Sequence, residues 1–287
     1  MSDIGKKRAF FEKARKSGYA IGAFNFSEIS QLKGIVEASS RLGLPFMAET
    51  SQAESSYLGA QTAVALKKAA ELEIKKPIIL NLDHGRSFEI LKSAIDAGYD
   101  MVHFDGSKLP LSENIKIAKK VVNYARKNGV LVEGEVGYLR GASKIHTEDV
   151  IICQKDMTCP EEAREFVENT GVDFLAIAIG NLHGISAKKP KLDIKRLAEI
   201  NKAVRKSAFL VLHGGSGIPP AQIKKAIENG IVKINVNTEL RIAWRNGLRN
   251  SLIKNRDEVA PPVIMPSVIE EVRKAAEAKL KLFSGKN

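Results

Sequence analysis

Three of the five histidines in the chain occupy the same local setting. His84, His183 and His213 each follow an apolar run and directly precede a glycine, in the segments IILNLDHG, FLAIAIGNLHG and AFLVLHGG. Three neutral imidazoles leave one or two positions open on a divalent ion, as in catalytic zinc centres. Each histidine alone could be a packed side chain bonded to a backbone group. Three in one setting favour a metal site.

The strands and helices that position these histidines can be predicted from the alternation of two kinds of segment along the chain. Apolar runs alternate with segments of helical period. The runs cover residues 19–26, 44–50, 77–82, 100–105, 130–136, 174–179, 208–212 and 232–236. Eight strand–helix units predict an α/β fold, a (β/α)8 TIM barrel forming a single domain over residues 1–287, with an additional C-terminal helix over 267–283. A doubly wound open sheet is the alternative, but regular spacing favours closure.

Polar side chains gather where these runs end. In a TIM barrel the carboxyl ends of the strands share one rim, and catalytic groups lie there. The candidates at the run ends are Asn25, Ser51, Asp83, His84, Asp105, Ser107, Glu133, Glu135, His183, residues 213–216, Asn235, Asn237 and Thr238. We therefore predict an active site at this rim.

A glycine-rich turn follows the last of the three histidines. Gly214, Gly215 and Ser216 precede the helical segment IPPAQIKKAI, and Asn237 and Thr238 end the eighth run. Backbone N–H groups and the helix dipole at such a turn suit a phosphate. In many barrels the phosphate site follows strands seven and eight. The segment predicts a phosphate site beside the metal.

Composition narrows the class of protein. The chain has 287 residues, is 44% hydrophobic and carries a formal charge of +12. Its lysines are scattered along predicted helices beside glutamates, and no nucleic-acid motif accompanies them, so we expect solvated faces rather than nucleic-acid binding. No apolar run is long enough to span a membrane, and no signal peptide or disulfide framework is evident. We expect a cytoplasmic protein with an anionic small substrate.

The three histidine segments quoted above are accompanied by GYAIGAFNF, FDGSKLPLSENI, EGEVG, KINVNTELR and KLFSGK. Together, these segments resemble the class II, metal-dependent fructose-bisphosphate and tagatose-bisphosphate aldolase family. The resemblance implies that His84, His183 and His213 hold Zn²⁺ or another divalent cation. It implies that Asp83 is the catalytic acid/base; the alternative is that Asp83 orients a metal ligand. Asp105 and Glu135 resemble an acidic pair that supports the ligands or forms an alternate metal position.

The same resemblance implies the substrate residues and the reaction. Fructose or tagatose 1,6-bisphosphate would be cleaved reversibly to dihydroxyacetone phosphate and glyceraldehyde 3-phosphate. Such enzymes are usually homodimers or homotetramers, and a monovalent cation, Na⁺ or K⁺, often lies near the phosphate. The implied substrate-binding residues are Asn25, Ser51, Gly184, Lys188, Gly214, Gly215, Ser216, Asn235, Asn237, Thr238 and Arg241.

Departures from the family pattern cluster at the substrate. Ala187 stands where a phosphate-binding lysine is usual, and Lys188 is the adjacent substitute. The loop GYLRGASKIHTEDV lacks the usual glutamate, which leaves three candidates for the proton donor: His146, Glu148 and Asp149. The segment ETSQAESS also replaces a usual SPGA. A different acceptor aldehyde, or a non-catalytic sugar-phosphate-binding protein, is therefore an alternative. His103 is expected to be structural.

Overall fold

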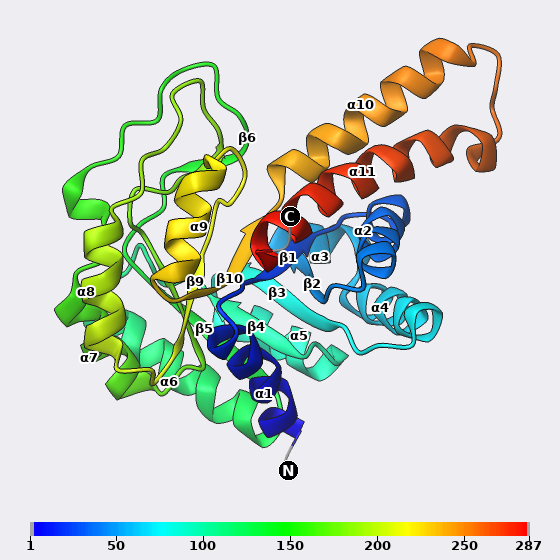
Figure 1. Ribbon diagram of the computed structural model, residues 1–287. Helices are drawn as coiled ribbons and strands as arrows, with labels where there is room; N and C mark the ends of the chain where they lie inside the picture. Colours follow the sequence, from blue (N-terminus) through cyan, green and yellow to red (C-terminus); the bar gives the residue numbers. More distant parts are fainter. Residues whose placement is uncertain (1–2, 286–287) are drawn as a thin grey trace.

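The computed structural model describes residues 3–285 and contains a closed barrel of parallel strands (Figure 1). Around the barrel the strands follow the order β1-β10-β9-β7-β5-β4-β3-β2. Their bounds are β1 Ile21–Asn25, β2 Phe46–Ser51, β3 Ile79–Gly85, β4 Met101–Phe104, β5 Leu131–Val136, β7 Phe174–Ile177, β9 Phe209–Leu212 and β10 Ile231–Val236. Each falls on one predicted apolar run. The predicted TIM barrel is confirmed, and the open sheet is not found.

Helices alternate with the strands and cover the outside of the barrel. Several end where a glycine adopts a left-handed backbone, as Gly43 does with a φ of 66° and Gly171 with 67°. The helices are α1 Asp3–Lys16, α2 Ile29–Leu42, α3 Gln52–Leu58, α4 Ala60–Ile74, α5 Phe88–Ala97, α6 Leu111–Lys127, η1 Gln154–Asp156, α7 Pro160–Thr170, α8 Ile194–Val204, α9 Pro220–Glu228, α10 Thr238–Lys254 and α11 Pro261–Ser284.

The additional C-terminal helix is confirmed as α11, which begins six residues earlier than predicted, at Pro261 instead of residue 267. It packs along α2 and α10, and the far ends of α10 and α11 project together from the barrel (Figure 1). Near its end Phe283 is buried and accepts the backbone N–H of Ala20 at 3.0 Å through its carbonyl. This contact attaches α11 to the barrel beside β1.

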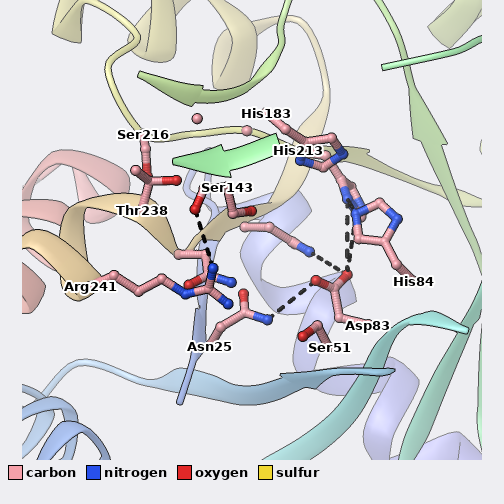
Figure 2. A pocket seen from close by; sticks show the side chains of 14 residues that line it. Asn25, Ser51, Asp83, His84, Ser143, His183, His213, Ser216, Thr238 and Arg241 are labelled. Carbon is pink, nitrogen blue, oxygen red and sulfur yellow. Dashed lines mark hydrogen bonds and ion pairs between the residues drawn. The ribbon is translucent and has the colours of Figure 1, made fainter. Parts of the chain in front are cut away.

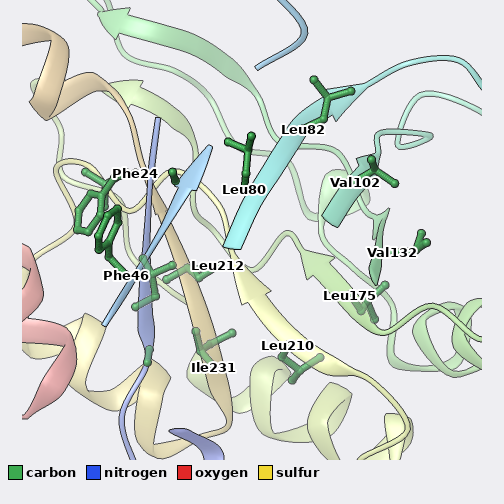
Figure 3. Packing of buried hydrophobic residues seen from close by; sticks show 14 of the residues in the cluster. Phe24, Phe46, Leu80, Leu82, Val102, Val132, Leu175, Leu210, Leu212 and Ile231 are labelled. Atoms are coloured by element: carbon green, nitrogen blue, oxygen red, sulfur yellow. The ribbon is translucent and has the colours of Figure 1, made fainter. Parts of the chain in front are cut away.

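Alternation along each strand divides the core into two layers. Side chains that point outward, among them Phe24, Leu80 and Leu210, pack against the surrounding helices (Figure 3). Side chains that point inward at the amino ends of the strands form a second apolar cluster. Phe11 of α1 closes that end of the barrel, with its ring 4.6 Å from Phe174. The barrel interior is therefore apolar at the amino ends of the strands, and polar residues occupy it at the carboxyl ends.

Two short strands were not predicted. β6 (Gly141–Ile145) follows β5, and β8 (His183–Ile185) follows β7; the two pair in parallel outside the barrel. Gly184 has a φ of 92°, and a Cβ there would lie 2.4 Å from the carbonyl oxygens of Ala142 and Lys144. Glycine after His183 is thus required by the approach of β6.

No helix in the described part of the chain combines the length and the apolar character that crossing a membrane requires.

Candidate metal centre and active site

The predicted polar residues line one pocket at the carboxyl ends of the strands (Figure 2). Asp83, His84, His183 and His213 lie on one side of it, and Arg241 and Asn25 lie on the other. The pocket is lined by Asn25, Ser51, Asp83, His84, Ser143, His183, Gly184, His213, Gly214, Ser216, Asn235, Asn237, Thr238 and Arg241. Ser143, on β6, is the one member that was not among the predicted substrate, metal or catalytic residues.

The three imidazoles meet at this pocket although their residues are far apart in the sequence. The ring centre of His84 lies 4.7 Å from that of His183 and 4.8 Å from that of His213. Nε2 of His84 is 3.1 Å from Nδ1 of His213. The ring centres of His183 and His213 are 6.3 Å apart, so the His84 ring lies close to both of the others. This arrangement suits a shared metal ion.

A local irregularity in β3 allows neighbouring residues to serve the same pocket. In a regular strand Asp83 and His84 would point to opposite faces. His84 instead has a left-handed backbone with a φ of 53°, and the pairing of β3 with β4 shifts register between Leu82 and Gly85. A left-handed histidine is uncommon and is found where function maintains it. Both side chains therefore reach the pocket.

Carboxylates fix the tautomers of two of the histidines. Asp105 accepts a hydrogen bond from Nδ1 of His84 at 3.1 Å, and Glu133 accepts one from Nε2 of His213 at 2.6 Å. The nitrogens that face each other, His84 Nε2 and His213 Nδ1, lie 3.1 Å apart, so a proton on one of them can be shared between the two rings. A divalent ion can take the place of this proton. The donor set therefore fits a divalent ion with its supporting carboxylates.

Acidic groups also surround His84 and His103. Glu135 lies 3.7 Å from Nδ1 of His84 and 3.1 Å from Nε2 of buried His103. The backbone N–H of His84 donates to Nδ1 of His103 at 3.1 Å. One ligand atom each from His84, Asp105 and Glu135 lies within 4.8 Å of the others, as an alternate metal position would require. His103 also has a ligand atom within 4.8 Å of those of Asp83, His84 and His213, so its structural role stays a prediction.

The pKa values of the three histidines separate by environment. Burial, and then the neighbouring imidazoles, hold the pKa of His183 well below its usual value. Burial likewise lowers the pKa of His213. Burial also lowers the pKa of His84, but the charge of Asp83 and the hydrogen bond with Asp105 outweigh it and raise the pKa to about 9. The negative charge that attracts this proton favours a metal cation for the same reason.

Asp83 is held on two sides by amides. Its Oδ2 accepts from Asn25 at 3.3 Å, and its Oδ1 accepts from Asn235 at 3.1 Å. Burial raises the pKa of Asp83, but the imidazoles, His84 first, outweigh burial and hold the pKa well below its usual range. The carboxylate is ionised, aimed at the pocket and able to accept a proton.

A buried ion-pair network lies beneath the metal residues. Lys233, fully buried on β10, contacts Glu49 at 2.8 Å and Glu133 at 2.9 Å, and it donates to Asn235 at 2.8 Å. Burial lowers the pKa of Lys233, but Glu133 and Glu49 outweigh burial and raise it above its usual value. Because Glu133 bonds His213 and Asn235 bonds Asp83, Lys233 supports a predicted metal ligand and the predicted acid/base together.

No role in the site was predicted for Lys233 or Glu49 in this network. A lysine inside an apolar strand, as in VKINV, is the signal that could have located it.

The residues of the predicted phosphate site that line the pocket meet at the amino end of α10, and not at that of α9, as the sequence had indicated. Gly214 has a φ of 64°, and a Cβ there would lie 2.0 Å from the carbonyl oxygen of Leu182. Ser216 and Thr238 are buried and face the pocket together (Figure 2). Gly215 does not line the pocket; its N–H donates to the carbonyl of Asn235 at 2.9 Å. Gly215 thus supports the turn from behind.

Lys188 and the three proton-donor candidates lie away from this pocket. The exposed turn after β8 carries Lys188 into a separate depression that Asp149 also lines, so its placement in the substrate pocket is corrected. Glu148 is exposed. His146 Nε2 is 2.8 Å from the carbonyl oxygen of His183 and attaches β6 to β8. The loop donor stays unassigned.

Arg241 reaches the pocket from α10 and is held on two sides. It donates to the carbonyl of Ser143 at 3.2 Å (Figure 2). It also forms an ion pair with Glu54 of α3 at 2.5 Å. Glu54 was not among the predicted site residues. The only signal for it was that ETSQAESS departs from the family pattern.

Comparison with known proteins places this site in a family. Residues 6–287 match the family described as fructose-bisphosphate aldolase class-II. A 6-phospho-5-dehydro-2-deoxy-D-gluconate aldolase of Shouchella clausii is 39% identical, over 96% of this chain and 92% of that protein. A fructose-bisphosphate aldolase of Staphylococcus epidermidis is 38% identical, over 96% of this chain and 95% of that protein.

Solved structures agree with these matches. The crystal structure of the YdjI aldolase from Escherichia coli K12 superposes with a TM-score of 0.82 and 32% identity, and the match covers 96% of each chain. Class II membership implies an aldehyde-lyase that uses a divalent metal, and the group of Asp83, His84, His103 and His213, whose ligand atoms lie within 4.8 Å of one another, could bind one. The chain belongs to the class II fructose-bisphosphate aldolase family.

Proposed function

We propose that this protein is a zinc-dependent aldolase that reversibly cleaves a phosphorylated ketose between C3 and C4, releasing dihydroxyacetone phosphate and an aldehyde. Fructose and tagatose 1,6-bisphosphate, with glyceraldehyde 3-phosphate as the aldehyde, are the substrates that the sequence predicts. The observation that carries the proposal is the convergence of the His84 ring with those of His183 and His213 beside ionised Asp83.

The donor set supports a metal-assisted route. When bound by His84, His183 and His213, a divalent ion would act as a Lewis acid on the substrate carbonyl and stabilise the charge of the enediolate. The chain offers no substitute in Lys233, because a Schiff-base lysine needs a lowered pKa and that of Lys233 is raised by Glu133 and Glu49.

Asp83 is the proposed acid/base. In cleavage its carboxylate takes the proton of the C4 hydroxyl, and in aldol addition it returns that proton. Asn25 and Asn235 fix the carboxylate through hydrogen bonds, so its orientation is set before substrate binds. Asn235 also lines the pocket and can contact the reacting carbons.

The phosphate of dihydroxyacetone phosphate is proposed to bind where Gly184, Gly214, Ser216 and Thr238 meet. Backbone N–H groups and hydroxyls there donate to phosphate oxygens, and the amino end of α10 contributes a favourable dipole. A Na⁺ or K⁺ ion near this phosphate stays a prediction.

Assembly into a homodimer or homotetramer also stays a prediction. It is supported by exposed apolar side chains at the projecting ends of α10 and α11, where Ile253 is 61% exposed and Val259 86% exposed. Exposed apolar side chains gathered on one projection suit a contact with another subunit.

Cleavage of a panel of phosphorylated ketoses, fructose 1-phosphate and fructose and tagatose 1,6-bisphosphate, measured with and without added Zn²⁺ and after chelation, tests the proposal. We expect activity that chelation removes and Zn²⁺ restores. Exchange of the C3 protons of dihydroxyacetone phosphate with D2O reports enediolate formation without an acceptor. Metal-replete protein that binds dihydroxyacetone phosphate tightly but shows neither cleavage nor exchange would instead be the non-catalytic sugar-phosphate-binding protein.

A further inference from the structure

Glu54 is a buried carboxylate behind the wall of the substrate pocket, on the side where Arg241 lies. The residue is 4% exposed. Its Oε1 pairs with Arg241 at 2.5 Å and accepts from the Asn237 amide at 3.2 Å. Its Oε2 accepts from the Asn25 amide at 3.1 Å and from the backbone N–H of Ser51 at 2.7 Å. Four donors from different elements hold this charge in place.

Helix capping explains only part of these contacts. Ser51 and Glu54 form a capping box at the start of α3, which accounts for the hydrogen bond to the Ser51 N–H. The contacts of Oε1 go instead to Asn237, just before α10, and to Arg241 on that helix. Capping of α3 requires neither of these two contacts. The ion pair between Glu54 and Arg241 is therefore considered for its effect on the charge of the pocket.

The ion pair between Glu54 and Arg241 neutralises the positive charge of Arg241 at this end of the pocket. Among the described residues that line the pocket, Arg241 is the single lysine or arginine. Its guanidinium already pairs with Glu54 and donates to the Ser143 carbonyl. A phosphate dianion placed here would lie close to the buried carboxylate and would compete with it for the same donors. Lys188, the other predicted cation, faces a separate depression.

We propose that Glu54 acts through Arg241 to exclude a phosphate from the acceptor end, so that the substrate is a ketose phosphorylated only at C1 and the acceptor is an uncharged polyhydroxy aldehyde. This inference rests on the proposed aldol function. Polar side chains at this end, Asn25, Ser51 and Asn237, offer donors and acceptors that suit sugar hydroxyls. Glu54 is then a positioning residue that determines specificity.

The test measures aldol addition of dihydroxyacetone phosphate to two acceptors, D-glyceraldehyde and D-glyceraldehyde 3-phosphate. We expect kcat/KM for glyceraldehyde to exceed that for its phosphate by about tenfold or more in the unmodified protein. Glu54→Gln keeps the shape and removes the charge, so the ratio should shift toward the phosphate by about tenfold or more. Glu168→Gln, on an exposed part of α7, makes the same charge change and should leave the ratio unaltered.

Proton exchange of dihydroxyacetone phosphate separates the two proposals. A protein that performs neither exchange nor addition contradicts the aldol function itself. A protein that performs exchange but prefers glyceraldehyde 3-phosphate overturns the role of Glu54, as does an unchanged ratio in folded Glu54→Gln. Because the preference of the unmodified protein already decides between the outcomes, the test does not depend on the variant folding.

Discussion

The two sides of the pocket are built from different parts of the fold. On the metal side, Asp83 lies in a barrel strand and His84 and His213 lie at strand ends, each fixed by a neighbouring carboxylate or amide. On the acceptor side, Asn25 and Ser51 also end barrel strands, but Arg241 comes from a helix and Ser143 from a strand outside the barrel. The difference indicates that the barrel strands set the chemistry, while helices and loops set the choice of acceptor.

The largest effect is expected from Asp83→Asn, which keeps the shape but removes the base. Cleavage should fall by about 10²–10⁴-fold, the usual contribution of a positioned acid/base. Proton exchange on dihydroxyacetone phosphate should fall less, because that molecule lacks the C4 hydroxyl that Asp83 deprotonates. The rates of cleavage and of proton exchange are measured for the variant and the unmodified protein, and the zinc content is measured on the same samples. Loss of zinc in this variant would show that Asp83 orients a ligand instead.

A smaller effect on activity, joined to lower stability, is expected from Lys233→Met. Breaking a buried ion pair leaves Glu49 and Glu133 uncompensated and should lower the free energy of unfolding by about 3–5 kcal/mol. Activity should also fall, because Glu133 then holds His213 less firmly. Lys188→Met, on an exposed turn, is the matched control and should change stability by less than about 0.5 kcal/mol. Equal unfolding curves for the two variants would contradict the assigned role of the network.

The sequence predicted the metal side well because strand ends in a closed barrel are forced to one rim. Asp83, His84 and His213 needed only the strand assignment to be brought together, whereas His183 lies on β8, which was not predicted. The left-handed backbone of His84 could not be predicted, because regular alternation sends Asp83 and His84 to opposite faces. The buried network was overlooked because Lys233 and Glu49 were treated as ordinary strand residues.

The acceptor side was predicted less well, for a physical reason. The contact of Glu54 with Arg241 joins residues 187 positions apart on two helices, and no local pattern encodes such a pair. Lys188 was placed in the pocket by adjacency to Ala187, but the turn after β8 carries it outward. The pairing of β6 with β8 likewise depends on the path of two loops and not on periodicity.

Metal binding by the three imidazoles is tested most directly by titrating the chelated protein with Zn²⁺ against a chromophoric chelator. We predict one tight site per chain, weakened about 100-fold or more in His213→Ala. The site should be unchanged in the control Glu168→Gln, on an exposed part of α7. Absence of a tight site, or equal affinity in His213→Ala and the unmodified protein, would contradict the account.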